Sequence, residues 1–250
     1  MKYIHSEAVH NLQAPQEIVP RVIELLRPNS VIDVGCGIGT FLHVFKQHHV
    51  VDVLGVDGDW VDRGLLSKYL APAEFVERDL ETPLNVGRRF DLVVCLEVAE
   101  HLGAHAAATF IDSLTTLGDA ILFSAAIPGQ GGQNHLNEQP LSYWISLFQA
   151  RGFRYNDSVR RLFWTNDKVQ WWYRQNMVLF LRNGTHSALP ASDQSTADVV
   201  HPDSWQAKTW IDLVRLTEGE ANLSRYLRLL AKRAVGRTVW ERVTRRTFRQ

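Results

Sequence analysis

The chain has 250 residues, of which 45% are hydrophobic and 22% charged, and its 27 basic residues balance 27 acidic ones. This composition predicts a globular domain with a full core and excludes a disordered chain. No apolar run approaches the roughly 18 residues of a membrane span, and the amino terminus lacks the apolar core of a signal peptide. Two cysteines, Cys36 and Cys95, do not suggest a disulfide framework, so the expected compartment is the cytoplasm.

The first predicted element is a helix, because apolar residues ahead of position 28 recur at helical spacing: Ile18, Val22, Leu25 and Leu26. Before it stand Tyr3, His5 and His10. We interpret the two histidines as surface residues; a leader segment that covers a ligand is the alternative.

The stretch VIDVGCGIGTF at positions 31–41 combines a short β-branched strand, a glycine loop and the start of a helix. Glycines at such a turn adopt backbone conformations that side chains forbid, and they let a ligand lie against the main chain. The loop glycines are Gly35, Gly37 and Gly39. The stretch therefore predicts a cradle for a nucleotide-type ligand.

The spacing of the loop differs from a dinucleotide fingerprint. The third glycine of that fingerprint would stand where this chain has Thr40. Asp33 lies in the strand just ahead of the loop, where its carboxylate would repel a pyrophosphate and attract an ammonium group. Both features disfavour a nicotinamide-dependent oxidoreductase.

Acidic residues follow the next two predicted strands. The nearly all-apolar strand at 50–56 leads to Asp57 and Gly58, and a carboxylate there can accept both ribose hydroxyl protons. The strand at 73–77 leads to Asp79 and Leu80. A plain turn or helix cap is the alternative role of Asp79.

Together these residues resemble the ordered motifs of the class I S-adenosylmethionine (SAM) methyltransferases, over residues 30–182. The resemblance implies an α/β fold: a Rossmann-like, seven-stranded, mostly parallel sheet with helices on both faces, an antiparallel last strand and a C-terminal helical extension. It implies SAM as cofactor, with the methionine end at the loop, the ribose at the acid after the second strand and the adenine after the third. The residues expected to bind it are Asp33, Gly35, Cys36, Gly37, Gly39, Asp57, Gly58, Asp79, Leu80 and Leu96.

The fourth strand, at 90–96, ends in a segment with metal-ligand residue types. If a helical turn begins there, Glu97, Glu100 and His101 share one face and can bind Mg²⁺ or Mn²⁺. The segment is similar to the metal-binding segment of ubiquinone-type and small-RNA 2′-O-methyltransferases, in which a later histidine completes the site. His135 is the expected fourth ligand. In the alternative without metal, His101 only orients a helix.

The fifth strand, at 120–126, opens into the long polar loop PGQGGQNHLNEQP at 128–140. Long loops at this edge of a sheet carry function, so His135 is expected to act as a general base or as a metal ligand. A loop pinned by its own side chains is the alternative. The run also resembles a bacterial methyltransferase subgroup associated with glycan and specialised-metabolite gene clusters.

The methyltransferase domain is predicted at 1–182, a linker with a short helix at 183–222 and a basic amphipathic helical tail at 223–250. The domain closes with a helix at 141–149, a strand from 153 and an apolar strand at 177–181; its aromatic segment holds Trp164, Trp171, Trp172 and Tyr173. We expect packing there, with stacking on a sugar or base as the alternative. The tail would contact a membrane surface, a polyanion or a second subunit.

The resemblance implies a SAM-dependent methyltransferase. We expect O-methylation of a hydroxyl on a sugar, a glycan or a specialised metabolite, with Glu97, His101 and His135 as catalytic residues. Two alternatives remain: N- or C-methylation of a small molecule, and a non-catalytic module of this fold tethered by its basic tail.

Overall fold

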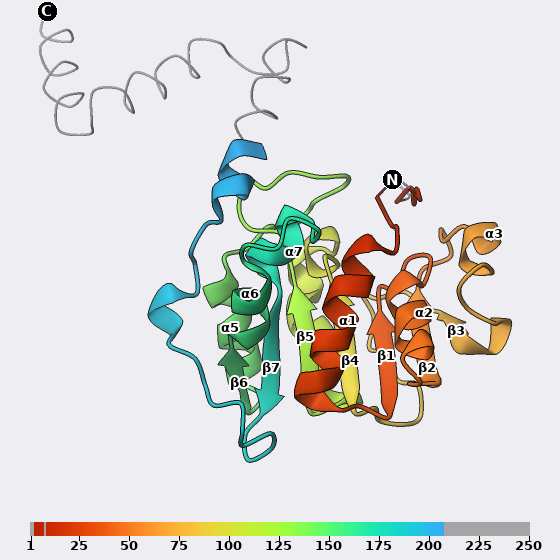
Figure 1. Ribbon diagram of the computed structural model, residues 1–250, viewed down its shortest axis with the longest axis horizontal. Helices are drawn as coiled ribbons and strands as arrows, with labels where there is room; N and C mark the ends of the chain where they lie inside the picture. Colours follow the sequence, from red (N-terminus) through yellow and green to blue (C-terminus); the bar gives the residue numbers. More distant parts are fainter. Residues whose placement is uncertain (1–2, 8, 208–250) are drawn as a thin grey trace, which may run out of the picture. The chain divides into compact units, whose positions relative to one another are not determined.

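The computed structural model describes residues 3–7 and 9–207 of the chain. At its centre lies a seven-stranded sheet in the order β3-β2-β1-β4-β5-β7-β6 (Figure 1). The strands are β1 (Ser30–Val34), β2 (Asp52–Asp57), β3 (Phe75–Glu77), β4 (Leu92–Leu96), β5 (Ala120–Ser124), β6 (Phe153–Asn156) and β7 (Val178–Arg182). The pairings among β1 to β5 are parallel, whereas β7 runs antiparallel to both neighbours, as predicted.

Helices cover both faces of the sheet (Figure 1). They are α1 (Gln13–Leu26), α2 (Thr40–Gln47), α3 (Arg63–Leu66), α4 (Ala107–Leu117), α5 (Leu141–Gln149), α6 (Ser158–Phe163) and α7 (Trp171–Asn176). Short 3₁₀ turns occupy Pro72–Glu74, Ala99–His101, Ala104–Ala106 and Gln194–Thr196. The predicted helix at 141–149 is confirmed at both ends.

Alternate residues of each central strand enter two separate cores. Val94 and Leu122 pack with α1, α2 and α6, whereas Val93 and Ile121 pack with α4 and α5. This alternation follows because successive side chains of a strand point to opposite faces of the sheet. Since both faces are covered by helices, β4 and β5 have continuous apolar sequences.

The chain order of the strands creates a crevice between β1 and β4. From β1 the chain winds outward through β2 and β3, and it then returns to β4 on the opposite side. Asp33 in β1 pairs with Val94 in β4, so the glycine loop and Glu97 leave the sheet side by side. Ligands bind at such a switch point in open α/β sheets.

The domain continues past β7. One compact unit ends at Ser204, and a second begins at Trp205. Residues 183–204, which we call the strap, hydrogen-bond back to the domain. Arg154, for example, donates to the carbonyl oxygens of Thr185 and His186. The predicted basic tail at 223–250 lies outside the described residues.

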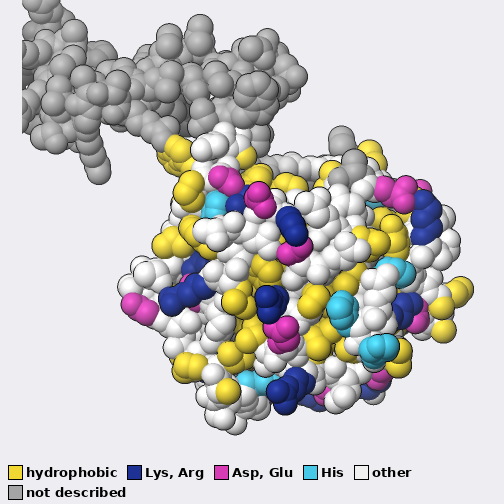
Figure 2. Space-filling view, in the orientation of Figure 1, with side chains coloured by type: hydrophobic (Ala, Val, Ile, Leu, Met, Phe, Trp, Pro, Cys, Tyr) yellow, Lys and Arg dark blue, Asp and Glu magenta, His cyan; other side chains and the backbone are white. Residues whose placement is uncertain are grey.

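Charges are mixed on the surface that carries α1 and α6 (Figure 2). Basic and acidic side chains lie beside one another there, as in the Arg21–Glu24 pair at 2.8 Å and the Lys168–Glu17 pair at 3.4 Å. This face presents no broad area of one charge sign. Within the described residues, none of the helices combines the length and the hydrophobicity needed to cross a bilayer.

Candidate active site

A cavity of about 320 Å³ opens at the carboxyl edge of the sheet. The glycine loop, the end of β4, the loop after β5, α7 and the N-terminal segment all contribute to its wall. Its lining includes these predicted site residues: Asp33, Gly35, Cys36, Gly37, Asp57, Leu96, Glu97, Glu100, His101 and His135.

The glycine loop is shaped by contacts that a side chain would destroy. Gly35 has φ +84°, and a Cβ on it would lie 2.3 Å from a methyl of Val98. A Cβ on Gly37, at φ +53°, would lie 3.0 Å from the Nε2 atom of His5. Gly39 lies outside the cavity lining and begins α2 at φ +86°. Because Gly35 and Gly37 have no side chain, Val98 and His5 can pack against the loop backbone.

Two buried carboxyl groups lie under this loop. Burial and the nearby Asp57 raise the pKa of Asp33 to about 8. Asp57 accepts hydrogen bonds from the backbone N–H groups of Gly37, at 2.8 Å, and Gly58, at 2.6 Å. Burial raises its pKa as well, although both hydrogen bonds oppose that rise. Asp57 thus holds the loop in place, and its contact with a ribose stays a prediction.

The expected adenine residues lie apart from the cavity lining. Asp79 is exposed, and its carboxylate accepts a hydrogen bond from the backbone N–H of Glu81 at 2.9 Å. This is the turn-capping role that we gave as the alternative to a contact with adenine. Leu80 is buried in the core with α4 and α5. Trp60, which packs over Gly58 and lines the cavity, is an aromatic residue that the sequence did not single out.

Glu97 does not share a helical face with the other two metal-ligand candidates. Its φ is +56°, and the 3₁₀ turn that holds Glu100 and His101 begins only at Ala99. The Glu97 carboxylate instead accepts from the side-chain amides of Gln130, at 2.9 Å, and Asn176, at 3.1 Å. The predicted common face was wrong because β4 ends in a left-handed residue rather than in a helix.

Three of the four predicted metal ligands do converge. Glu100, His101 and His135 can each place one ligand atom within 4.8 Å of the others. Glu100 is fully buried, and neither carboxylate oxygen has a hydrogen-bond partner of regular geometry. Burial, together with the charge of Glu97, raises the pKa of Glu100 well above its usual value. Burial, reinforced by His135, lowers the pKa of His101 to about 4, so its imidazole is neutral near pH 7.

The glycine-rich loop orients His135 through Glu138. The Glu138 carboxylate accepts from the backbone N–H groups of Gly129, at 2.5 Å, and Gly131, at 2.7 Å, and lies 2.8 Å from Nδ1 of His135. A Cβ on Gly132 would lie 2.2 Å from Nε2 of the same ring. The loop is therefore pinned by its own side chain, and the contact with Glu138 fixes the orientation of the His135 ring.

The N-terminal segment forms part of the cavity wall, so the interpretation of His5 and His10 as plain surface residues was wrong. Tyr3, His5 and His10 all line the cavity, and the Tyr3 ring lies 5.1 Å from that of His101. Burial lowers the pKa of His5 to about 4. No periodicity signals this placement, because it depends on a contact across about 100 residues of chain.

Over residues 8–193 the sequence matches a family profile described as a methyltransferase domain. The chain belongs to this methyltransferase family. No curated protein sequence matches the methyltransferase.

Solved structures share its fold. A sugar N-methyltransferase from Streptoalloteichus sp. aligns with a TM-score of 0.55 at 17% identity, covering 73% of the methyltransferase and 94% of that chain. DesVI from Streptomyces venezuelae aligns with a TM-score of 0.52 at 14% identity, covering 72% and 100%. At such identities the likeness is one of fold.

The cavity fits SAM, the methyl donor of this enzyme. The narrow cradle at Gly35 and Gly37 suits a ligand that lies against the main chain. Asp33 is a buried carboxyl on the wall of this cavity, and an ammonium group such as that of SAM would suit it when it is ionised.

Several residues of the site carry no sequence motif. Gln170 lines the cavity together with Trp171 and Trp172, and Asn176 is hydrogen-bonded to Gln130 on its wall. Tyr173 also packs on Phe41 of α2, with ring centroids 5.7 Å apart. The aromatic segment thus packs against α2 and also lines the cavity. In the sequence, only its position just before the apolar closing strand could have indicated that it lies at the site.

Proposed function

We propose that the methyltransferase methylates a hydroxyl oxygen of a sugar, a glycan or a specialised metabolite, and that Glu100, His101 and His135 hold a divalent cation beside the acceptor. The observation that carries the proposal is the buried Glu100 carboxyl, which has no hydrogen-bond partner of regular geometry and can place an oxygen within 4.8 Å of a ring nitrogen of both His101 and His135. Buried carboxylates are expected to be paired or to coordinate metal.

The donor set indicates which cation to test. Two imidazoles and one carboxylate suit Mn²⁺ better than Mg²⁺, which prefers oxygen ligands. The Glu138 carboxylate beside Nδ1 of His135 is the outer partner that ligating histidines usually have. A bound cation would act as a Lewis acid on an acceptor oxygen and ease its deprotonation.

The residues of the chain supply positioning and proton transfer. SAM, when bound, provides a methyl group already activated on a sulfonium, so the enzyme has mainly to align the acceptor, remove its proton and exclude water. Tyr3 and Trp171 close the cavity around that position. In a second, metal-free form of the proposal, Nε2 of His135 is the general base, oriented by Glu138. N- or C-methylation of a small molecule is the alternative reaction.

The test is calorimetric titration of Mn²⁺ and Mg²⁺ into the EDTA-treated protein, with and without SAM. Glu100→Gln is expected to abolish Mn²⁺ binding, while Glu24→Gln, an exposed acid on α1, leaves it unchanged. Radiolabelled SAM is then offered with sugars that carry vicinal hydroxyls. Mn²⁺ binding that survives Glu100→Gln contradicts the cation site, and methyl transfer that EDTA does not affect favours His135 as base.

A further inference from the structure

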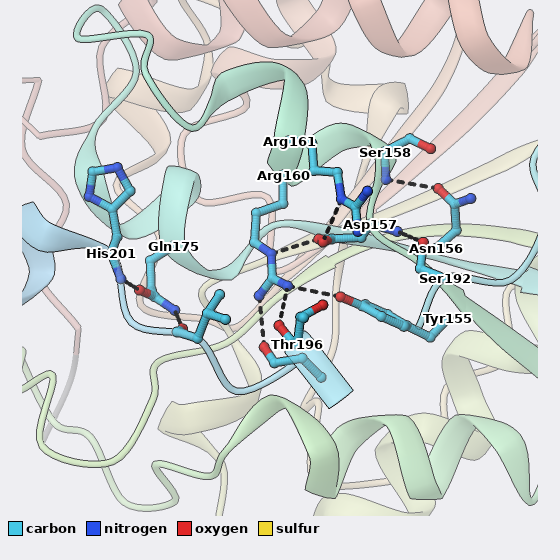
Figure 3. Close-up of polar contacts among 12 residues, drawn as sticks. Tyr155, Asn156, Asp157, Ser158, Arg160, Arg161, Gln175, Ser192, Thr196 and His201 are labelled. Carbon is cyan, nitrogen blue, oxygen red and sulfur yellow. Dashed lines mark hydrogen bonds and ion pairs between the residues drawn. The ribbon is translucent and has the colours of Figure 1, made fainter. Parts of the chain in front are cut away.

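The strap is fastened to the domain by a buried guanidinium (Figure 3). Arg160 is 2% exposed and donates to the carbonyl oxygens of Thr196, at 3.1 Å, and Ala197, at 2.8 Å. Its other N–H groups reach Asp157 at 2.6 Å and Tyr155 at 2.9 Å. Since releasing a partner would leave a buried charge unpaired, these bonds hold the strap in one position.

Further along, the strap binds the side chain of Gln175 at the end of α7 (Figure 3). Gln175 is 1% exposed. Its Nε2 donates to the carbonyl oxygen of Val199 at 2.7 Å, and its Oε1 accepts from the backbone N–H of His201. The amide therefore bonds the strap backbone at both ends, as a neighbouring strand would.

The next residue, Asn176, faces the active site. Its Nδ2 lies 3.1 Å from Oε1 of Glu97 and 2.9 Å from Oε1 of Gln130. Helix α7 has only six residues, too few to be stable as an isolated helix. The position of Asn176 therefore depends on hydrogen bonds from outside the helix. The two bonds between Gln175 and the strap are next to it in the chain.

Glu97 connects this network to the cofactor loop. Its backbone lies in the left-handed region, which a non-glycine residue adopts only when its surroundings impose it. The following residue, Val98, packs so closely on Gly35 that a Cβ there would lie 2.3 Å away. Relaxation at Glu97 would thus displace Val98 from the loop that cradles SAM.

We propose that the strap is a positioning element of the SAM site and that Gln175 is the positioning residue through which it acts. Gln175 fixes Asn176, Asn176 holds the carboxylate of Glu97, and Glu97 keeps Val98 against the glycine loop. The strap thereby governs cofactor affinity without touching the cofactor.

The test measures SAM affinity by calorimetry, which needs no acceptor and no metal. Gln175→Met removes both strap bonds at nearly constant volume and is expected to weaken SAM binding about five- to tenfold. The control is Asn156→Ala, which removes the 2.7 Å bond to the carbonyl oxygen of Pro190 elsewhere on the strap. It is expected to lower thermal stability and to change SAM affinity less than about twofold.

A double-mutant cycle separates positioning from general destabilisation. If Gln175 acts through Asn176, the pair Gln175→Met and Asn176→Ala binds SAM no more weakly than Asn176→Ala alone. Additive losses, or an equal loss in Asn156→Ala, would overturn the proposal. Should Gln175→Met fail to fold, Gln175→Asn, whose shorter side chain cannot span both strap partners, is run through the same cycle with the same two outcomes. A protein that binds SAM but methylates no sugar contradicts only the proposed acceptor.

Discussion

The half of the cavity that we assign to SAM, the cofactor half, and the half that we propose for the acceptor, the acceptor half, are built in different ways. The cofactor half comes largely from one continuous stretch, in which Asp33 and the glycine loop follow each other between β1 and α2. The acceptor half brings together Tyr3, Glu100, His135 and α7 from four separate parts of the chain. A site built from consecutive residues is visible in the sequence, whereas a site assembled by distant contacts becomes visible only in the fold.

The largest effect is expected at Gly35. Gly35→Ala places a Cβ at a left-handed φ and against Val98, and the backbone strain alone costs about 1–3 kcal/mol of unfolding free energy. We expect SAM binding to be lost. Gly87→Ala is the matched control, because its φ is +75° but no atom lies within 4 Å of the new Cβ. Urea denaturation and SAM titration of both variants distinguish the backbone strain, which both share, from the steric clash with Val98, which only Gly35→Ala has. Equal effects in the two variants would contradict the role of this clash.

A second large effect is expected in the acceptor half. Glu138→Gln removes the negative charge and one of the two oxygens that contact the loop backbone and His135, so Mn²⁺ affinity should fall about 10–100-fold. Glu81→Gln is the control, since Glu81 also accepts from a backbone N–H, that of Gly103, but lies outside the cavity lining. If calorimetry finds that both variants bind Mn²⁺ with the same affinity, Glu138 has no role in the cation site.

A pH dependence distinguishes the cofactor half. Because the pKa of Asp33 is raised to about 8, the free protein holds this proton at pH 7 and must release it when an ammonium group binds. SAM affinity should therefore rise by up to about tenfold per pH unit between pH 6 and 7.5. Asp33→Asn should bind more weakly and lose this slope. Titrations in buffers of different ionisation enthalpy report the proton directly.

The same raised pKa has a consequence for the free protein. Protonated Asp33 stabilises the fold below the unfolded pKa, about 4, and this contribution is lost as pH rises through about 8. Thermal melts without SAM should fall over that window, and those of Asp33→Asn should not.

The smallest effect is expected where the N-terminal segment meets the residues just after α3. Lys68 pairs with Glu7 of that segment at 2.7 Å, and both side chains are about half exposed. Lys68→Met should leave the free energy of unfolding nearly unchanged, because exposed ion pairs contribute little. Stopped-flow measurement of SAM binding, with Lys46→Met as control, would show whether the pair influences closure of the segment.

Most of the fold could be predicted because apolar periodicity and strand-ending acids are local signals. The closing strand was expected at 177–181 and lies at Val178–Arg182. The errors share one cause. The helical face at Glu97 and the surface position of His5 were both inferred from neighbouring residues, but long-range partners decide them: Asn176 for Glu97 and Gly37 for His5.

The buried guanidinium of Arg160 also sets an order on biosynthesis. Its carbonyl partner in Thr196 is 36 residues further along the chain. At about 5–20 residues per second, the ribosome adds that partner roughly 2–7 s after the arginine. All seven strands have been synthesised by residue 182, so the arginine receives its last carbonyl acceptors only after the whole sheet has been made. A nascent chain that ends between these positions would hold a guanidinium without its full set of acceptors.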